Sequence, residues 1–138
     1  MGRHYDIISK YIGLMLFKQA PQKEGKEKVM AVFDDFLKLD IRAGEIVRCE
    51  DFPKARKPAY KVWVDFGQEI GLKQSSAQIT DLYKKEDLLG RQVLGVVNFP
   101  PRQIADFISE VLVLGVYSSE GVVLIEPTQR VSNGDKLG

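Results

Sequence analysis

The chain has 138 residues with 20 Lys plus Arg against 19 Asp plus Glu, and it is 44% hydrophobic and 28% charged. These values are typical of one globular domain, and they exclude a wholly disordered, collagen-like or fibrous chain. The single cysteine, Cys49, and the single histidine, His4, exclude an internal disulfide and a Cys/His zinc site. The net charge of +1 argues against a strongly basic nucleic-acid binder, but it leaves room for a local basic stripe.

Residues 1–31 are predicted to form a helix and a polar linker outside the compact domain. Apolar residues recur at helical spacing over residues 5–18, which predicts a short amphipathic helix. The stretch 18–28 is polar and contains proline and glycine, as in a linker. The apolar run is too short for a membrane span, and a signal peptide is the less favoured interpretation because no small-x-small cleavage site follows. We therefore expect a soluble, cytoplasmic protein without membrane insertion, with its core domain at residues 32–138.

The predicted domain begins with a short helix and a bent strand. Asp34 and Asp35 precede the apolar residues of segment 36–39, which favours one or two helical turns with the acids at the N-terminus. Residues 40–49 follow as a strand. The side-chain parity changes within this strand, and Gly44 is the expected position of a bulge.

Residues 59–66 predict a half-buried antiparallel strand. Apolar and polar residues alternate there, which assigns Tyr60, Val62, Val64 and Phe66 to the core face. Trp63 belongs to the opposite face, where it would serve either as a platform for base stacking or as a partner-interface residue.

The remaining elements complete a small barrel. A strand is expected at residues 70–74, and the capping-box pattern of residues 75–78 predicts a helix that ends near Gly90. Further strands are predicted at residues 92–99, 111–117 and 122–126, and Asn133-Gly134 predicts a turn in the tail. One helix between the third and fourth strands is the arrangement of the OB-fold. We therefore predict a mainly β protein, an OB-fold five-stranded Greek-key barrel with an N-terminal helical extension.

Residues that could support catalysis are scarce. His4 lies outside the predicted domain, so a histidine-activated nucleophile is not expected. The chain contains neither a P-loop nor a G-x-G-x-x-G motif, and its carboxylates lack metal-ligand spacing. We therefore predict a binding protein rather than an enzyme, with no metal and no cofactor. Cys49 is interpreted as a small buried hydrophobic residue.

Basic residues gather around the connection between the first two strands. They are Arg48, Lys54, Arg56, Lys57 and Lys61. In an OB barrel this loop borders the ligand face, where Lys and Arg would contact phosphates. An ordinary solvated loop is the alternative interpretation of the same charges.

Several ordered motifs over residues 32–138 resemble the tRNA-binding domain family. The matching stretches are residues 34–44, 65–67, 74–79, 96–104 and 109–110. The family includes appended domains of methionyl-tRNA synthetases, free-standing tRNA-binding proteins and export-related chaperones. Residues 73–80, 97–102 and 109–115 most closely resemble the export-chaperone branch. Where tRNA-binding members commonly carry Ser-x-Gly-Met, this chain has Ser109-Glu110-Val111-Leu112, which also favours that branch.

The resemblance implies an OB-fold homodimer that binds tRNA and unfolded or exported polypeptides, with a tRNA-binding protein lacking a chaperone role as the alternative. By motif position it implies six polar RNA-binding residues, which are Ser75, Ser76, Asn98, Arg102, Ser109 and Glu110. Each has an alternative interpretation without an RNA contact. Ser75 would simply cap a helix, Asn98 would simply end a strand, and Glu110 would repel phosphate unless it pairs with Arg102. The implied dimer interface draws on apolar residues at both ends of the domain, namely Phe33, Phe36, Leu37, Ile125 and Val131.

Overall fold

The computed structural model describes residues 29–138. The helix predicted over residues 5–18 and the linker predicted over residues 18–28 lie outside the described residues. Contacts divide the chain into two units, residues 1–36 and residues 37–138. A boundary between residues 31 and 32 stays a prediction.

Helix α2 (Phe33–Leu37) is short and carries its acids at the N-terminal end, as predicted. It begins three residues earlier than the expected segment. The Asp35 carboxylate accepts a hydrogen bond from the Val32 backbone N–H at 3.0 Å, which satisfies one donor that the helix itself leaves unpaired. None of its residues is buried.

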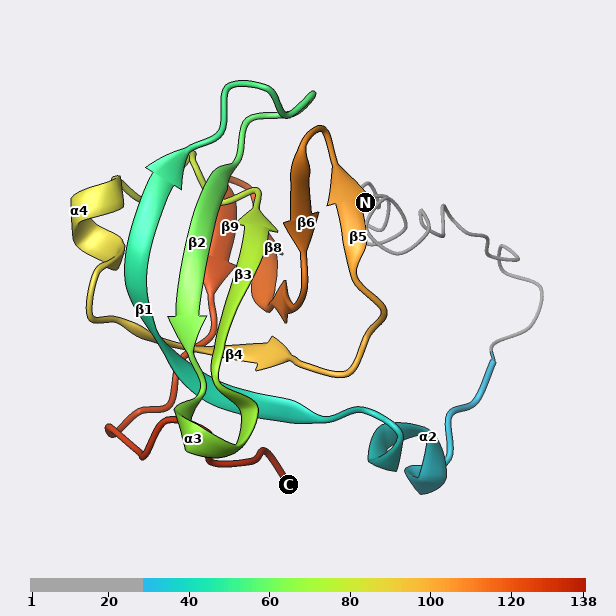
Figure 1. Cartoon of the computed structure of the whole chain (residues 1–138). Helices are drawn as coiled ribbons and strands as arrows, with labels where there is room; N and C mark the ends of the chain where they lie inside the picture. Colours follow the sequence, from blue (N-terminus) through green and yellow to red (C-terminus); the bar gives the residue numbers. More distant parts are fainter. Residues whose placement is uncertain (1–28) are drawn as a thin grey trace. The chain divides into compact units, whose positions relative to one another are not determined.

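An antiparallel five-stranded sheet forms the body of the second unit (Figure 1). Its strands are β1 (Ile41–Asp51), β2 (Tyr60–Asp65), β3 (Leu72–Ala77), β4 (Gln92–Val96) and β7 (Leu112–Val113). Their spatial order is β3-β2-β1-β4-β7, and the long, curved β1 pairs with both β2 and β4. This is the connectivity of a nearly closed OB-fold barrel, which confirms the predicted fold class.

The barrel closes around aliphatic side chains and one phenylalanine. Val62, Val64 and Phe66 are fully buried, so the alternation predicted for β2 is confirmed. Ile46 from β1 and Val93 from β4 complete the centre of the core. The two edge strands of the sheet, β3 and β7, come together at a place named here the seam. There the N–H of Glu110, just before β7, donates to the Gln74 carbonyl of β3 at 2.8 Å.

The bulge in β1 lies at Val47, not at Gly44 as predicted. The pairing register with β2 shifts between Ile46 and Arg48, whereas Gly44 pairs regularly with Val93. Gly44 is required for a different reason, because a Cβ atom there would lie 2.6 Å from Val64 Cγ1. Glycine at this position therefore allows close packing inside the barrel rather than a bend in the strand.

The prediction that a helix starts at Ser75 is also wrong. Residues 75–77 continue β3, where Lys61 and Val62 of β2 pair with Ser76 and Ser75. The connection from β3 to β4 does contain a helix, but this is the single turn α4 (Lys85–Leu88). A second short helix, α3 (Gly67–Ile70), occupies the expected turn between β2 and β3.

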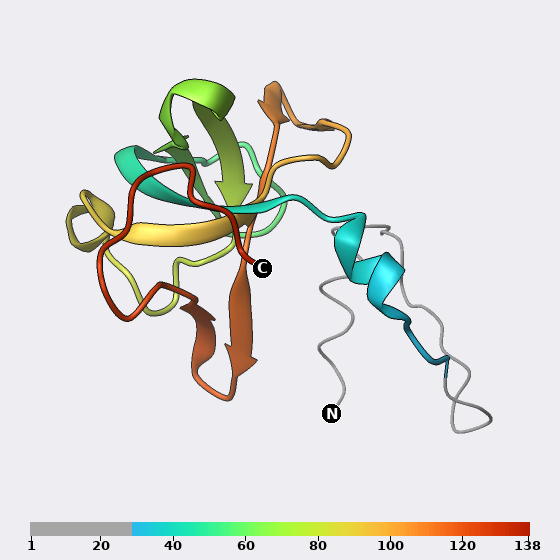
Figure 2. The same ribbon diagram turned by 90° about the horizontal axis from the view of Figure 1, so that it is seen from below.

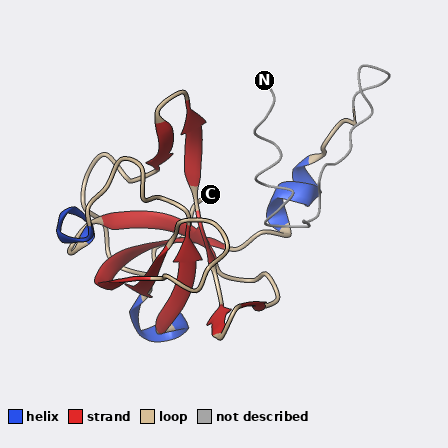
Figure 3. Cartoon of the chain, turned by 90° about the horizontal axis from the view of Figure 1, so that it is seen from above, coloured by secondary structure: helices blue, strands red, loops and turns tan. Residues whose placement is uncertain are grey.

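Two hairpins project from the barrel on opposite sides (Figures 2 and 3). The first contains β5 (Arg102–Ile104) and β6 (Phe107–Ser109), which were not predicted as strands. The second contains β8 (Gly115–Ser118) and β9 (Gly121–Leu124). The predicted strand over 111–117 is interrupted at Leu114, whose N–H bonds to the Leu94 carbonyl.

The C-terminal tail runs beside the first half of β1. Gly134 N–H donates to the Ala43 carbonyl at 2.7 Å, and Leu137 N–H donates to the Ile41 carbonyl at 2.8 Å. Gly134 has φ of 100°, which confirms the predicted turn. Among residues 29–138, no helix has the length and apolarity that crossing a membrane requires.

Candidate nucleic-acid interface

The loop between β1 and β2 packs against the β5–β6 hairpin through aromatic side chains. The ring centroids of Phe52 and Phe107 lie 5.4 Å apart, and those of Trp63 and Phe107 lie 6.0 Å apart, both in edge-on geometry. Phe52 is 4% exposed and Phe107 is 6% exposed. These three residues, named here the outer aromatic cluster, join two segments that are far apart in the sequence.

Basic side chains lie on the same loop, strand and hairpin as the residues of the outer aromatic cluster. Lys54 forms an ion pair with Asp106 at the tip of the hairpin, with 2.8 Å between Nζ and Oδ2. Lys61 Nζ lies 4.9 Å from the centroid of the Phe52 ring, within cation–π range. Arg56 and Lys57 are exposed on the loop. Together with Arg102 in β5, these residues form what we call the basic face: Lys54, Arg56, Lys57, Lys61 and Arg102.

The ion pair at the hairpin tip shifts the titration of both partners. The hydrogen bond from Lys54 is the main cause that lowers the pKa of Asp106, and Lys61 lowers it further. The same hydrogen bond raises the pKa of Lys54. Both groups are therefore charged at neutral pH.

Trp63 lies on the outer face of β2 as predicted, but its ring is not an open stacking platform. The guanidinium of Arg48 lies 4.4 Å from the ring centroid, and the indole N–H donates to Gln74 Oε1 at 3.2 Å. Since Phe107 also contacts the ring, one function of Trp63 is to anchor the hairpin to the sheet.

Four of the polar residues that the family resemblance implied lie at the seam of the barrel. Ser76 N–H donates to Ser109 Oγ at 3.0 Å, and Gln74 N–H donates to Glu110 Oε1 at 3.0 Å. The hydroxyl of Ser75 donates to the Val111 carbonyl at 2.9 Å and is 1% exposed. Ser75 is thus neither a helix cap nor a surface group, and its RNA contact stays a prediction.

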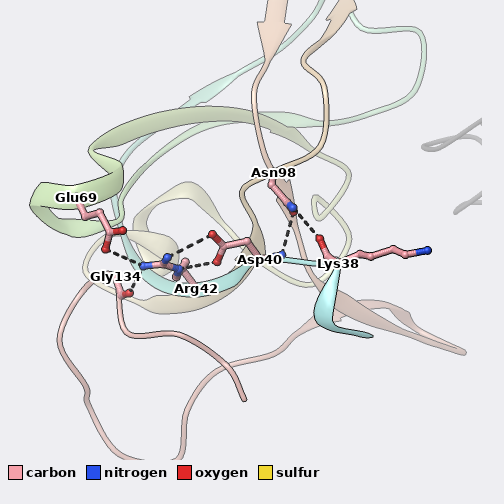
Figure 4. A network of polar contacts seen from close by, with 6 residues as sticks. All are labelled: Lys38, Asp40, Arg42, Glu69, Asn98 and Gly134. Atoms are coloured by element: carbon pink, nitrogen blue, oxygen red, sulfur yellow. Dashed lines mark hydrogen bonds and ion pairs between the residues drawn. The ribbon is translucent and has the colours of Figure 1, made fainter. Parts of the chain in front are cut away.

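Asn98 links the segment after β4 to the segment before β1, at the end of β1 opposite the β1–β2 loop (Figure 4). Its Oδ1 accepts from Asp40 N–H at 2.9 Å, and its Nδ2 donates to the Lys38 carbonyl at 2.8 Å. Asp40 in turn pairs with Arg42 at 2.6 Å, and Arg42 also contacts Glu69. Asn98 therefore holds the entry to β1 and lies away from the loop that carries most of the basic face.

The residues predicted for a dimer interface are exposed or half-buried. Phe33 and Leu37 are 70% and 57% exposed. Ile125 is half-buried, and the backbone of Val131 is held at both N–H and carbonyl by the Gln92 side chain. The interface stays a prediction.

The outer face of the β8–β9 hairpin presents apolar side chains that sequence analysis did not identify. Val116 and Val123 are paired across the hairpin and are both exposed. Asp106 and Phe107 were missed as well, because three-residue strands are too short to show a clear alternation.

Cys49 is partly buried and packs against the core, and this burial raises the pKa of its thiol to about 11. A thiol that stays protonated at neutral pH is a weak nucleophile. Over residues 29–138, no group of three or more His, Cys, Asp or Glu side chains is arranged to hold a metal ion.

The fold and this face together define an OB-fold barrel with a basic loop and hairpin at one end. Residues 41–136 match the family described as "Putative tRNA binding domain", and the chain belongs to this family. It is 36% identical over 120 residues to the methionine–tRNA ligase of Thermococcus onnurineus and 38% identical over 120 residues to that of Pyrococcus abyssi. These matches cover 87% of the chain but only 16% of each ligase, so they concern one domain of those enzymes.

Two solved structures of chaperones are also similar to this chain. The CsaA chaperone protein of Picrophilus torridus is 52% identical, with a TM-score of 0.76 over 79% of this chain and 100% of that protein. The chaperone CsaA of Bacillus anthracis is 52% identical, with a TM-score of 0.75 over 80% of this chain and 100% of that protein.

Proposed function

We propose that the chain binds tRNA through the basic face and performs no catalytic step. The observation that supports this most directly is the packing of the β1–β2 loop against the β5–β6 hairpin, which gathers cations from β2, β5 and the loop. OB-folds bind oligonucleotides through the loop between barrel strands 1 and 2 and the loop between barrel strands 4 and 5. Here these are the β1–β2 loop and the connection from β4 to β7, which contains the β5–β6 hairpin. Lys and Arg in such a place neutralise phosphates and release counterions. Of the polar motif residues, Ser109 ends β6 of the hairpin and Ser76 and Glu110 lie beside it; all three are proposed to support the position of the hairpin.

Salt dependence of tRNA binding tests this proposal. Replacing Arg56, Lys57 and Arg102 by Ala should weaken binding and reduce the slope of log affinity against log salt by about 2 to 3 units, if each side chain meets one phosphate. The matched control removes three cations elsewhere, Lys84, Arg130 and Lys136. An unchanged slope in the first variant, or an equal loss in the control, would contradict the assignment of the basic face.

We also propose that the protein is a cytoplasmic homodimer that binds unfolded or exported polypeptides, as its similarity to CsaA chaperones suggests. Exposed Val116 and Val123 provide apolar surface of the kind that contacts such chains. Light scattering should give a dimer mass at micromolar concentration. Binding of an unfolded polypeptide should persist at salt concentrations that release tRNA. A tRNA-binding protein without a chaperone role is the alternative, and co-purification of RNA without polypeptide from lysate would favour it.

Residues 1–28 are proposed to be dispensable for the barrel. A chain that starts at Met30 should then be soluble and should melt close to the full chain. Insolubility or a large loss of melting temperature would show that the N-terminal region stabilises the domain.

A further inference from the structure

The tip of the β5–β6 hairpin places a carboxylate within the basic face. Ile104 pairs with Phe107, so Ala105 and Asp106 form a two-residue turn. Ala105 has φ of 54° and is the sole non-glycine residue with a positive φ among residues 29–138. This position of a tight turn favours glycine. Asp106 follows this left-handed residue directly, and its ion pair with Lys54 shows that it points at the loop.

The carboxylate forms an ion pair with one cation of the basic face. Asp106 Oδ2 accepts a hydrogen bond from Lys54 Nζ at 2.8 Å. The charge of Lys61 makes a smaller contribution to the lowered pKa of the carboxyl group. Part of the positive charge available to a phosphate is therefore already neutralised within the protein.

The ion pair does little to hold the loop and the hairpin together. The Lys54 and Asp106 side chains are 70% and 56% exposed, and ion pairs at such positions contribute little to stability. Phe52 and Phe107, which are both buried, join the same two segments independently of charge. The main effect of Asp106 is thus electrostatic, and it acts on whatever anion approaches Lys54.

We propose that Asp106 competes with RNA phosphates for Lys54 and thereby lowers the affinity of the basic face for polyanions. A phosphate that binds Lys54 must displace the carboxylate or approach a like charge. Isolated phosphates are disfavoured most, whereas tRNA can engage the other cations of the basic face at the same time. This inference rests on the proposed tRNA-binding function.

The test measures the affinity of the full chain for unfractionated tRNA at several salt concentrations. Asp106→Asn removes the charge and keeps the shape, and it should tighten binding about two- to fivefold, the range expected when one exposed ion pair is removed. The salt slope should steepen by up to about 0.9 if Lys54 then neutralises one more phosphate. Glu126→Gln is the matched control. Glu126 forms an ion pair with Arg91, which precedes the first residue of β4. That residue, Gln92, pairs with Glu45 of β1, and Glu45 lies about 20 Å along β1 from the β1–β2 loop.

The outcomes separate this inference from the function on which it rests. Equal or weaker binding by Asp106→Asn, or equal tightening by Glu126→Gln, would overturn it. When Lys54 is already replaced by Ala, Asp106→Asn should tighten tRNA binding less than it does in the wild type, because the cation that pairs with Asp106 is absent. If wild-type protein binds no tRNA, or if removing Arg56, Lys57 and Arg102 has no effect, the proposed function itself fails. Asp106→Ser and a thermal melt of each variant control for local distortion.

Discussion

The barrel core and the outer aromatic cluster are both built around phenylalanine, but they are held in different ways. Phe66 lies at the centre of a nearly closed sheet, surrounded by fully buried aliphatic side chains and paired strands. Phe52 and Phe107 lie under a loop and a hairpin of three-residue strands, with charged side chains above them. The first region has the contacts that stabilise a fold, whereas the second positions charges at the surface. Stability and binding should therefore respond to substitutions in different regions.

The largest expected effect compares one phenylalanine from each region. Phe66→Ala should lower the free energy of unfolding by about 3–5 kcal/mol, because the nearly closed barrel can collapse into the cavity only in part. Phe52→Ala should cost about 1–3 kcal/mol, since a loop can relax, but it should weaken tRNA binding. Urea unfolding followed by circular dichroism measures the first quantity, and a filter-binding titration measures the second. Equal losses of stability would remove the distinction between the two regions.

The next largest effect concerns glycines that face Phe66. At Gly44 an added Cβ would lie 2.6 Å from Val64 Cγ1 and 2.7 Å from Phe66 Cδ1. Gly44→Ala should therefore destabilise the barrel by about 1–3 kcal/mol through overpacking. The matched control is Gly95→Ala, whose Cβ would meet Phe66 Cζ at 3.1 Å and should be better tolerated. If the two variants melt at the same temperature, close packing at Gly44 is not what limits that position.

Asn98 distinguishes a structural role from an RNA contact. Asn98→Ala removes both hydrogen bonds to the entry of β1, and it should cost about 1–2 kcal/mol of stability. The affinity for tRNA should stay within twofold of wild type. Asn98→Asp keeps the acceptor for Asp40 N–H but places a charged oxygen against the Lys38 carbonyl, so its loss of stability should be at least as large as that of Asn98→Ala. A fall in tRNA affinity with unchanged stability would instead support the contact that the family resemblance implies.

The smallest expected effect is a gain in stability. Ala105→Gly relieves the left-handed backbone at the hairpin tip, and it should stabilise the protein by about 0.5–1 kcal/mol. Ala55→Gly in the neighbouring loop is the control, because that residue has no positive φ and should gain nothing. Differential scanning calorimetry resolves both changes. A loss of stability in Ala105→Gly would mean that the turn is not strained.

Local pattern determined much of this protein. The alternation of residues 59–66 assigned Val62, Val64 and Phe66 to the core, since period-two spacing places successive side chains on opposite faces. The cations between the first two strands were visible because they are close in sequence, and the ordered motifs identified the family. These signals come from neighbouring residues and do not need a partner from elsewhere in the chain.

Only the tertiary structure decided what the polar motif residues contact. Ser75 to Gln78 has the spacing of a capping box, but the strand pairing with β2 and the carbonyl of Val111 use those groups instead. Lys54 and Asp106 are 52 positions apart, and Asn98 and Asp40 are 58 positions apart. No local periodicity encodes such pairs, because they depend on how the sheet curls and where its hairpins emerge. The basic residues were therefore readable from the sequence, whereas the carboxylate placed among them was not.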